Sequence, residues 1–112
     1  MEVITEQIGD VCLALISSES LVADNTKDFK REISPLLESN AKIVLDMSQL
    51  QFVDSSGIGA ILSCMKHLSV SGGELKLCSV TKQVRSIFEM VRLHRVVDMF
   101  NTKEEALRSF SE

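Results

Sequence analysis

Two adjacent serines have the clearest capacity for chemistry, in the segment Asp54-Ser55-Ser56-Gly57-Ile58-Gly59. A short apolar run, Lys42 to Met47, lies before them, and apolar residues at helical spacing follow them. A helix start leaves backbone N–H groups unpaired and carries partial positive charge, so it favours an anion. We therefore expect the fold to accept a phosphate on Ser55, with a stabilisation of about 0.3–1 kcal/mol. Gly57 and Gly59 have no side chains to obstruct a close approach.

The same segment permits other interpretations. Serine is a preferred N-cap residue, and a cap role does not exclude phosphorylation. A nucleophilic serine would need a base, but the G-x-S-x-G motif is absent, and His67 lies about 16–18 Å further along the same helix. His94 lies in a loop-like stretch, and both histidines are expected at the surface. Gly57-x-Gly59 is only half of a dinucleotide fingerprint, and no Walker lysine accompanies it. We therefore expect no catalytic residues and a binding module rather than an enzyme.

Composition narrows the class of protein further. The 112 residues fit a single domain, 1–112, and 45% of them are apolar, which suffices for a core. The net charge of −4 is spread along the chain without a basic stripe, so neither nucleic acid nor a membrane surface is an expected partner. The chain has three cysteines, Cys12, Cys64 and Cys78. Because this number is odd and no CxxC motif occurs, we expect free thiols and no metal site. Without a signal peptide or an apolar span, the chain is expected to be cytoplasmic, with no cofactor.

The apolar pattern predicts five strands, the first two joined at Gly9-Asp10. The run KIVLDM is short and apolar, which is typical of a strand covered on both faces. The strands are Val3 to Ile8, Val11 to Ile16, Lys42 to Met47, Glu74 to Cys78 and Val96 to Phe100.

Four helices are expected to alternate with these strands. The first follows the polar stretch SSESLVADNT, and Pro35 should kink it or end it early because proline cannot donate to the carbonyl of Arg31. The second should end at Gly72-Gly73. Cap candidates are Asp24, Asn25 and Thr26 for the first helix, Thr81 for the third, and a Thr102–Glu105 capping box for the fourth. The alternation predicts an α/β fold: a mixed sheet of about four or five strands with about four helices, mainly on one face.

The run IVLDMSQLQFVDSSGIGAIL, followed by SGGELKLCSV and VRSIFEMVRLHRVVDMF, resembles the STAS-domain family, specifically bacterial anti-sigma factor antagonists. The resemblance extends from about Val11 to Phe110. It implies that the serine directly after the aspartate, Ser55, is phosphorylated by an anti-sigma factor that is also a serine kinase of the GHKL type. Ser56 is the second choice. The unphosphorylated form would bind the anti-sigma factor and thereby release the sigma factor. A metal-dependent serine phosphatase would remove the phosphate.

The resemblance also leaves an alternative partner. A STAS module can serve a transporter, or a biofilm or signalling circuit, instead of a sigma factor. Many family members carry a Gly-x-x-Asp-like turn after the second strand, near the partner surface. Here that stretch is Ser20-Leu21-Val22-Ala23, and Asp24 supplies the only acid.

A docking face is expected on the helix from Ser56 to Leu68. Apolar Ile58, Ile61, Leu62, Met65 and Leu68 should point inward, which leaves Ser56, Ala60, Ser63 and His67 on the opposite stripe, flanked by Gly57, Gly59 and Cys64. Such small residues let a partner come close, and a phosphate on Ser55 would stand at the head of the stripe. The expected partner-binding residues are Asp54, Ser55, Ser56, Gly57, Gly59, Ala60, Ser63 and Asp24.

Overall fold

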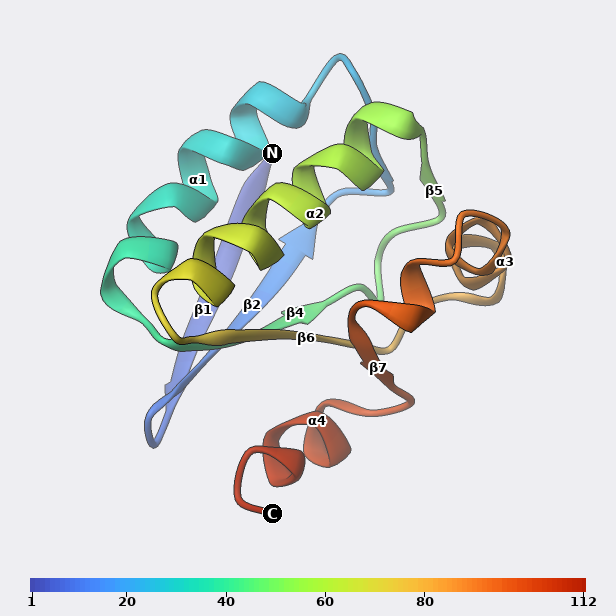
Figure 1. Cartoon of the computed structure of the whole chain (residues 1–112). Helices are drawn as coiled ribbons and strands as arrows, with labels where there is room; N and C mark the ends of the chain where they lie inside the picture. The colour runs from blue at the N-terminus through green and yellow to red at the C-terminus, as the bar shows by residue number, and fades with distance from the viewer.

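A five-stranded mixed sheet forms the centre of the computed structural model, which describes residues 1–112 (Figure 1). Its order is β1-β2-β4-β6-β7, and only β1 and β2 are antiparallel. The predicted mixed sheet is thereby confirmed, including the adjacency of its three central strands. The strands are β1 Glu2–Ile8, β2 Val11–Ser17, β4 Lys42–Asp46, β6 Glu74–Cys78 and β7 Asp98–Phe100.

Alternation of side chains along the strands gives the sheet two apolar faces. On β4, Ile43 and Leu45 join the larger core of 22 buried residues, whereas Val44 joins a smaller cluster of five on the other face. Helices α1 (Thr26–Ser39) and α2 (Ser55–Val70) lie together over the larger core, with α3 (Lys82–Met90) at the end of the sheet (Figure 1). The short α4 (Lys103–Ser109) covers part of the opposite face.

Several local predictions are confirmed. Thr81 accepts a hydrogen bond from the backbone N–H of Val84 and caps α3, and Thr102 with Glu105 forms the capping box of α4. Gly72, just after α2, has a φ of +83°, a conformation that glycine adopts without a Cβ clash. The three cysteines are buried and free, and burial raises the pKa of the Cys64 and Cys78 thiols to about 11.

Other predictions need correction. Helix α1 does not end early at Pro35 but continues to Ser39; Pro35 and Arg31 are exposed, so water can reach the carbonyl that proline leaves without a donor. The polar stretch before α1 contains a short strand, β3 (Ser20–Leu21), paired in parallel with β5 (Phe52–Val53). Strand β7 starts at Asp98 because a 3₁₀ turn, η1 (Leu93–Arg95), precedes it.

A buried lysine fixes α4 to the sheet. Lys76 on β6 is 5% exposed, and its Nζ donates to Oγ of Ser109 at 2.7 Å. The same ammonium lies 4.0 Å from the centroid of the Phe110 ring, within the range of a cation–π interaction. The charge is thus compensated on the face of the sheet that carries only one helix.

The orientation of α2 differs from the prediction. Ala60 is 1% exposed, and Gly57 and Cys64 are also buried, so these three residues face the core. Ile61 and Leu68 point inward as expected, whereas Ile58, Leu62 and Met65 are only half-buried. The helix packs beside α1, and Gly57 passes the Leu21 carbonyl on β3 too closely for any larger residue, so the small residues turn inward. The exposed side of α2 therefore carries Ser55, Ser56, Gly59, Ser63, Lys66 and His67.

This orientation makes a direct prediction about two substitutions on α2. Ala60→Arg should lower the free energy of unfolding by roughly 3 kcal/mol, because a charged side chain would be forced into a filled core. Ser63→Arg, less than one turn further and exposed, should change it by no more than about 0.5 kcal/mol. Urea denaturation of both variants measures the difference, and equal stabilities would mean that Ala60 faces solvent after all.

Candidate functional site

The hydroxyl groups of Ser55 and Ser56 lie free at the start of α2. Both residues are exposed and occupy the first two helical positions. Neither side chain makes a hydrogen bond within the chain, because the N-cap of the helix is Asp54 and not a serine. Ser55 is therefore available for modification without the loss of a structural contact.

Asp54 holds the helix start against a neighbouring turn. Its Oδ1 accepts from the backbone N–H of Gly57 at 2.9 Å, and its Oδ2 accepts from the N–H of Ala23 at 3.0 Å. The N–H of Asp54 donates to the carbonyl of Leu21 at 3.3 Å. The amides of Gly57 and then of Ala23 hold the pKa of the Asp54 carboxyl below its ordinary value of 3.8.

The turn before α1 is built by its own side chains. Oδ1 of Asn25 accepts from the N–H of Val22 at 2.9 Å, and its Nδ2 donates to the carbonyl of Ser20 at 2.9 Å. Asn25 therefore ties the turn together instead of capping α1 with its side chain. Asp24 stands exposed between Ala23 and Asn25, next to the amide that Asp54 binds. The candidate Asp24 is thus brought to the same end of the molecule as Ser55.

Gly57 and Gly59 have different roles although they are two residues apart. A Cβ on Gly57 would lie 2.1 Å from the carbonyl oxygen of Leu21, so only glycine fits where α2 passes β3. A Cβ on Gly59 would meet nothing within 4 Å. The space beside Gly57 is filled by the chain itself and is not open to a partner, contrary to the expectation.

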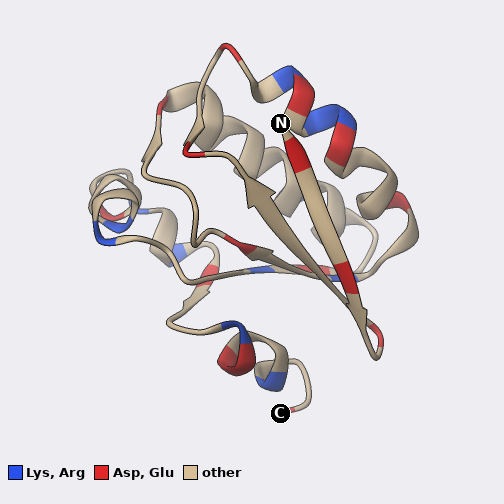
Figure 2. Ribbon diagram, turned by 180° about the vertical axis from the view of Figure 1, so that it is seen from behind, with Lys and Arg blue, Asp and Glu red and all other residues tan.

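The predicted site residues thus fall into two groups. Asp24, Asp54, Ser55 and Ser56 gather at one end of α2, and Gly59 and Ser63 continue along its exposed side. Gly57 and Ala60 are buried and contact the interior. Viewed from behind, basic and acidic residues alternate on α1 and no continuous basic stripe appears (Figure 2).

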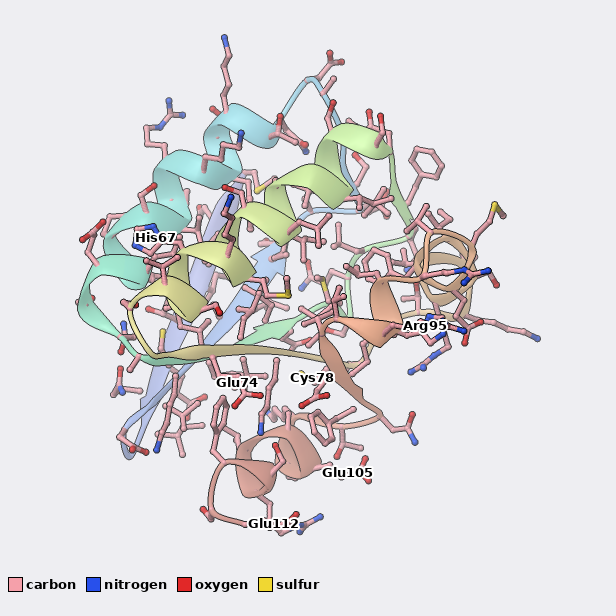
Figure 3. The ribbon with its side chains drawn as sticks, in the orientation of Figure 1. His67, Glu74, Cys78, Arg95, Glu105 and Glu112 are labelled. Atoms are coloured by element: carbon pink, nitrogen blue, oxygen red, sulfur yellow. The ribbon has the colours of Figure 1, made fainter.

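The histidines take no part in this site. Nε2 of His67 lies 3.5 Å from Oε1 of Glu38 on α1, and the residue is labelled beside α1 in Figure 3. His94 is exposed in η1, and neither ring hydrogen-bonds to Ser55. No group of three or more His, Cys, Asp or Glu residues is arranged to hold a metal ion. None of the helices combines the length and apolar character that a membrane span requires.

Sequence reasoning missed the pairing of β3 with β5, which brings the turn to Ser55. Each strand has only two residues, too few for a detectable alternation. One signal was present: each of the two short segments contains an adjacent apolar pair, Leu21-Val22 and Phe52-Val53, within a polar stretch, and Leu21 and Val53 are buried.

The two glycines supply a matched pair of substitutions. Gly57→Ala should lower the free energy of unfolding because the new methyl group would collide with the Leu21 carbonyl. Gly59→Ala should raise it by about 0.5–1 kcal/mol, since alanine is the better helix former and the position is open. Thermal and urea denaturation distinguish the signs, and stabilisation by both substitutions would contradict the close contact at Gly57.

The Asp54 carboxylate predicts a dependence of stability on pH. Because its pKa is lowered in the folded state, its contribution is complete above the ordinary value of 3.8 and is lost as the pH falls through the folded-state pKa. Asp54→Asn, which offers only one acceptor atom, should therefore destabilise the protein at about pH 7 and much less at about pH 2.5. The exposed neighbour serves as a control: Asp24→Asn should have little effect at either pH. A penalty for Asp54→Asn that is equal at both pH values would rule out the carboxylate as its source.

Comparison with known proteins gives the family. The STAS domain profile matches residues 2–106. A putative anti-sigma factor antagonist of Thermotoga maritima is 29% identical over 103 residues, 90% of this chain and 91% of that protein. An anti-sigma F factor antagonist of Paenibacillus polymyxa is 37% identical over 65 residues, 58% of this chain and 56% of that protein.

The architecture agrees with the sequence match. A crystal structure of a putative anti-sigma factor antagonist from Thermotoga maritima has a TM-score of 0.89 to this chain at 26% identity, covering 98% of this chain and 95% of that one. Together, the profile match and the shared fold show that the chain belongs to the STAS domain family and that its relatives are anti-sigma factor antagonists, which are regulators and not enzymes.

Proposed function

We propose that this chain is a phosphorylation-controlled anti-sigma factor antagonist. The unphosphorylated form binds an anti-sigma factor that is also a GHKL-type serine kinase, and this binding releases the sigma factor. Phosphorylation of Ser55 ends the complex, and a metal-dependent serine phosphatase restores it. The observation that carries the proposal is the exposed, unbonded hydroxyl of Ser55 at the first position of α2, directly after the capping Asp54.

The local geometry separates modification from folding. Asp54 and Gly57 already hold the helix start, so Ser55 contributes no hydrogen bond that a phosphate would break. The first turn of α2 contains no acidic residue, and the positive end of the helix tolerates an anion there. A phosphate therefore changes the surface while the domain stays folded.

The charge of the phosphate explains how it would end binding. A phosphoserine carries about −1.5 to −2 charges at neutral pH. At Ser55 this charge would join the acidic side chains of Asp54 and Asp24, at the head of the exposed side of α2. Beyond it, Ser56, Gly59 and Ser63 offer a partner backbone a surface of small side chains. A partner with an apolar or acidic patch that docks over these residues would be repelled directly.

The relatives support the class of partner. Those compared above carry the names anti-sigma F factor antagonist and putative anti-sigma factor antagonist, and another, from Bacillus subtilis, is an anti-sigma-B factor antagonist. By analogy with those names, we expect an anti-sigma factor to be the partner of this chain. The protein would then act in the cytoplasm, where sigma factors bind RNA polymerase.

The test uses three variants of the full chain. Ser55→Ala should capture an anti-sigma factor with a GHKL-type ATPase domain from a lysate of the source cells, identified by mass spectrometry. Ser55→Asp should bind the purified kinase at least tenfold more weakly than Ser55→Ala in calorimetric titration, a difference of about 1.4 kcal/mol. Ser56→Ala is the matched control and should retain both binding and phosphorylation.

Two results would contradict the proposal. One is equal affinity of the kinase for Ser55→Ala and Ser55→Asp. The other is phosphate transfer to Ser56 in the Ser55→Ala variant, measured by intact mass and peptide mapping, which would assign the switch to the second serine.

A further inference from the structure

A groove runs along the side of α2 that faces η1, away from the exposed side described above. Its first hollow, about 440 Å³, has an apolar floor that includes Ile58, Leu62 and Leu93, with Arg92 and Arg95 at the rim. A second hollow, about 250 Å³, continues past Met65 and Ser69, and Val96 lines both. We call these two adjoining hollows, which share Val96, the α2 groove.

The α2 wall of the groove is a regular row. Ile58, Leu62, Met65 and Ser69 are spaced by four, three and four residues, which places them along one side of the helix over about 16 Å. The three apolar members are only half-buried because neither the sheet nor η1 covers them fully. On the opposite wall, Val91 is 51% exposed and Val96 is 58% exposed. So much adjoining apolar surface is typical of a binding site.

The rim of the first hollow is positively charged and unpaired. Neither Arg92 nor Arg95 takes part in any of the three ion pairs of the chain, and neither side chain makes an internal hydrogen bond. Arg95 is labelled on η1 in Figure 3, where it lies well apart from Glu74 at the start of β6. The free guanidinium groups are suited to carboxylates.

The backbone conformation of Arg92 also supports a functional site here. This residue follows the C-cap of α3 and has a φ of +61°, a left-handed conformation in which glycine is normally favoured. An arginine there is strained, and residues held in such conformations are concentrated at functional sites.

The other end of the groove has the opposite charge. Glu74 and Asp98 line the second hollow and form no ion pair. The groove thus runs from two cations near the start of α2 to two carboxylates near its end. A helix with acidic residues in its first turns and basic residues in its last turns complements this order, and its own dipole favours the same distribution.

We propose that the α2 groove docks an amphipathic helix of a partner protein, with the acidic first turns of that helix at Arg92 and Arg95. Its apolar row packs between Ile58, Leu62 and Met65 on one side and Val91 and Val96 on the other, as in other helix-in-groove complexes. The proposal does not depend on phosphorylation of Ser55.

The test uses a synthetic helical peptide of about 16 residues, long enough to span the row. Leucines occupy positions i, i+4, i+7 and i+11, glutamates the first two turns, and lysines the last two. A second peptide carries glutamine for each glutamate. We expect the acidic peptide to bind the full chain at least tenfold more tightly than the glutamine peptide, in fluorescence anisotropy. Amide NMR shifts should be confined to α2 and to the other segments that line the groove, 73–75 and 91–98.

Two variants separate binding from folding. Arg92→Gly relieves the backbone strain, so it should fold at least as stably as the parent yet bind the acidic peptide at least fivefold more weakly. The Arg92→Glu/Arg95→Glu variant should abolish the preference for the acidic peptide. Lys27→Glu/Arg108→Glu changes the net charge equally at exposed positions outside the groove and should leave binding unchanged.

The proposal would be overturned by no binding of the acidic peptide, equal binding of both peptides, affinity unchanged in Arg92→Gly, or shifts outside the groove. Decanoate serves as a small amphiphile for comparison. If decanoate gave the same shifts and displaced the peptide at lower concentration, the groove would be a small-molecule site instead. Self-association through the groove in sedimentation equilibrium would likewise overturn the proposal in favour of a second copy of this chain.

Discussion

The carboxylate of Asp54 is the interaction on which the candidate site depends. Its two oxygens accept from the amides of Ala23 and Gly57, 34 residues apart in sequence, one in the turn before α1 and one in the first turn of α2. Each bond satisfies a backbone donor that would otherwise need water, and together they fix where the turn ends and where the helix begins. The close passage of Gly57 over the Leu21 carbonyl is possible only in this arrangement. Asp54 therefore acts as a positioning residue, and the adjacent serine is left free.

The groups that hold the site together are separate from the group that would be modified, so this small domain would change its surface without changing its fold. The groups that hold the site together are a carboxylate, a glycine and the amide side chain of Asn25. The hydroxyl that would be modified makes no hydrogen bond to any of them. A charge added at Ser55 thus acts on whatever approaches from outside, by repulsion over short distances that the surrounding salt screens only in part. No relay through the core is needed.

The sequence allowed the framework to be predicted but not the details around it. The strands Lys42–Asp46 and Glu74–Cys78 are apolar runs between clear stop signals, and the caps at Thr81 and Thr102 follow local rules, so these elements could be predicted. The rotation of α2 could not, because Ala60 and Gly57 are ambiguous by type: small residues serve equally at a surface and where two elements pack closely. Hydrophobicity favoured Ile58, Leu62 and Met65 as the inward side, but close packing against β3 and α1 placed the small residues there. Tertiary contact decided between two patterns that the helical period alone leaves equal.

The buried thiols have a consequence for measuring motion in this protein. Cys64 lies on the inner side of α2, and its thiol has a pKa of about 11, so in the closed structure it is both shielded and almost entirely protonated. Alkylating reagents attack the thiolate and need access, and both are supplied only when the helix lifts from the sheet. The alkylation rate of Cys64 would therefore record how often α2 opens, and that of Cys78 how often α4 detaches from the opposite face. Each of the two apolar layers thus contains a buried thiol whose alkylation rate reports the opening of the helix that covers it.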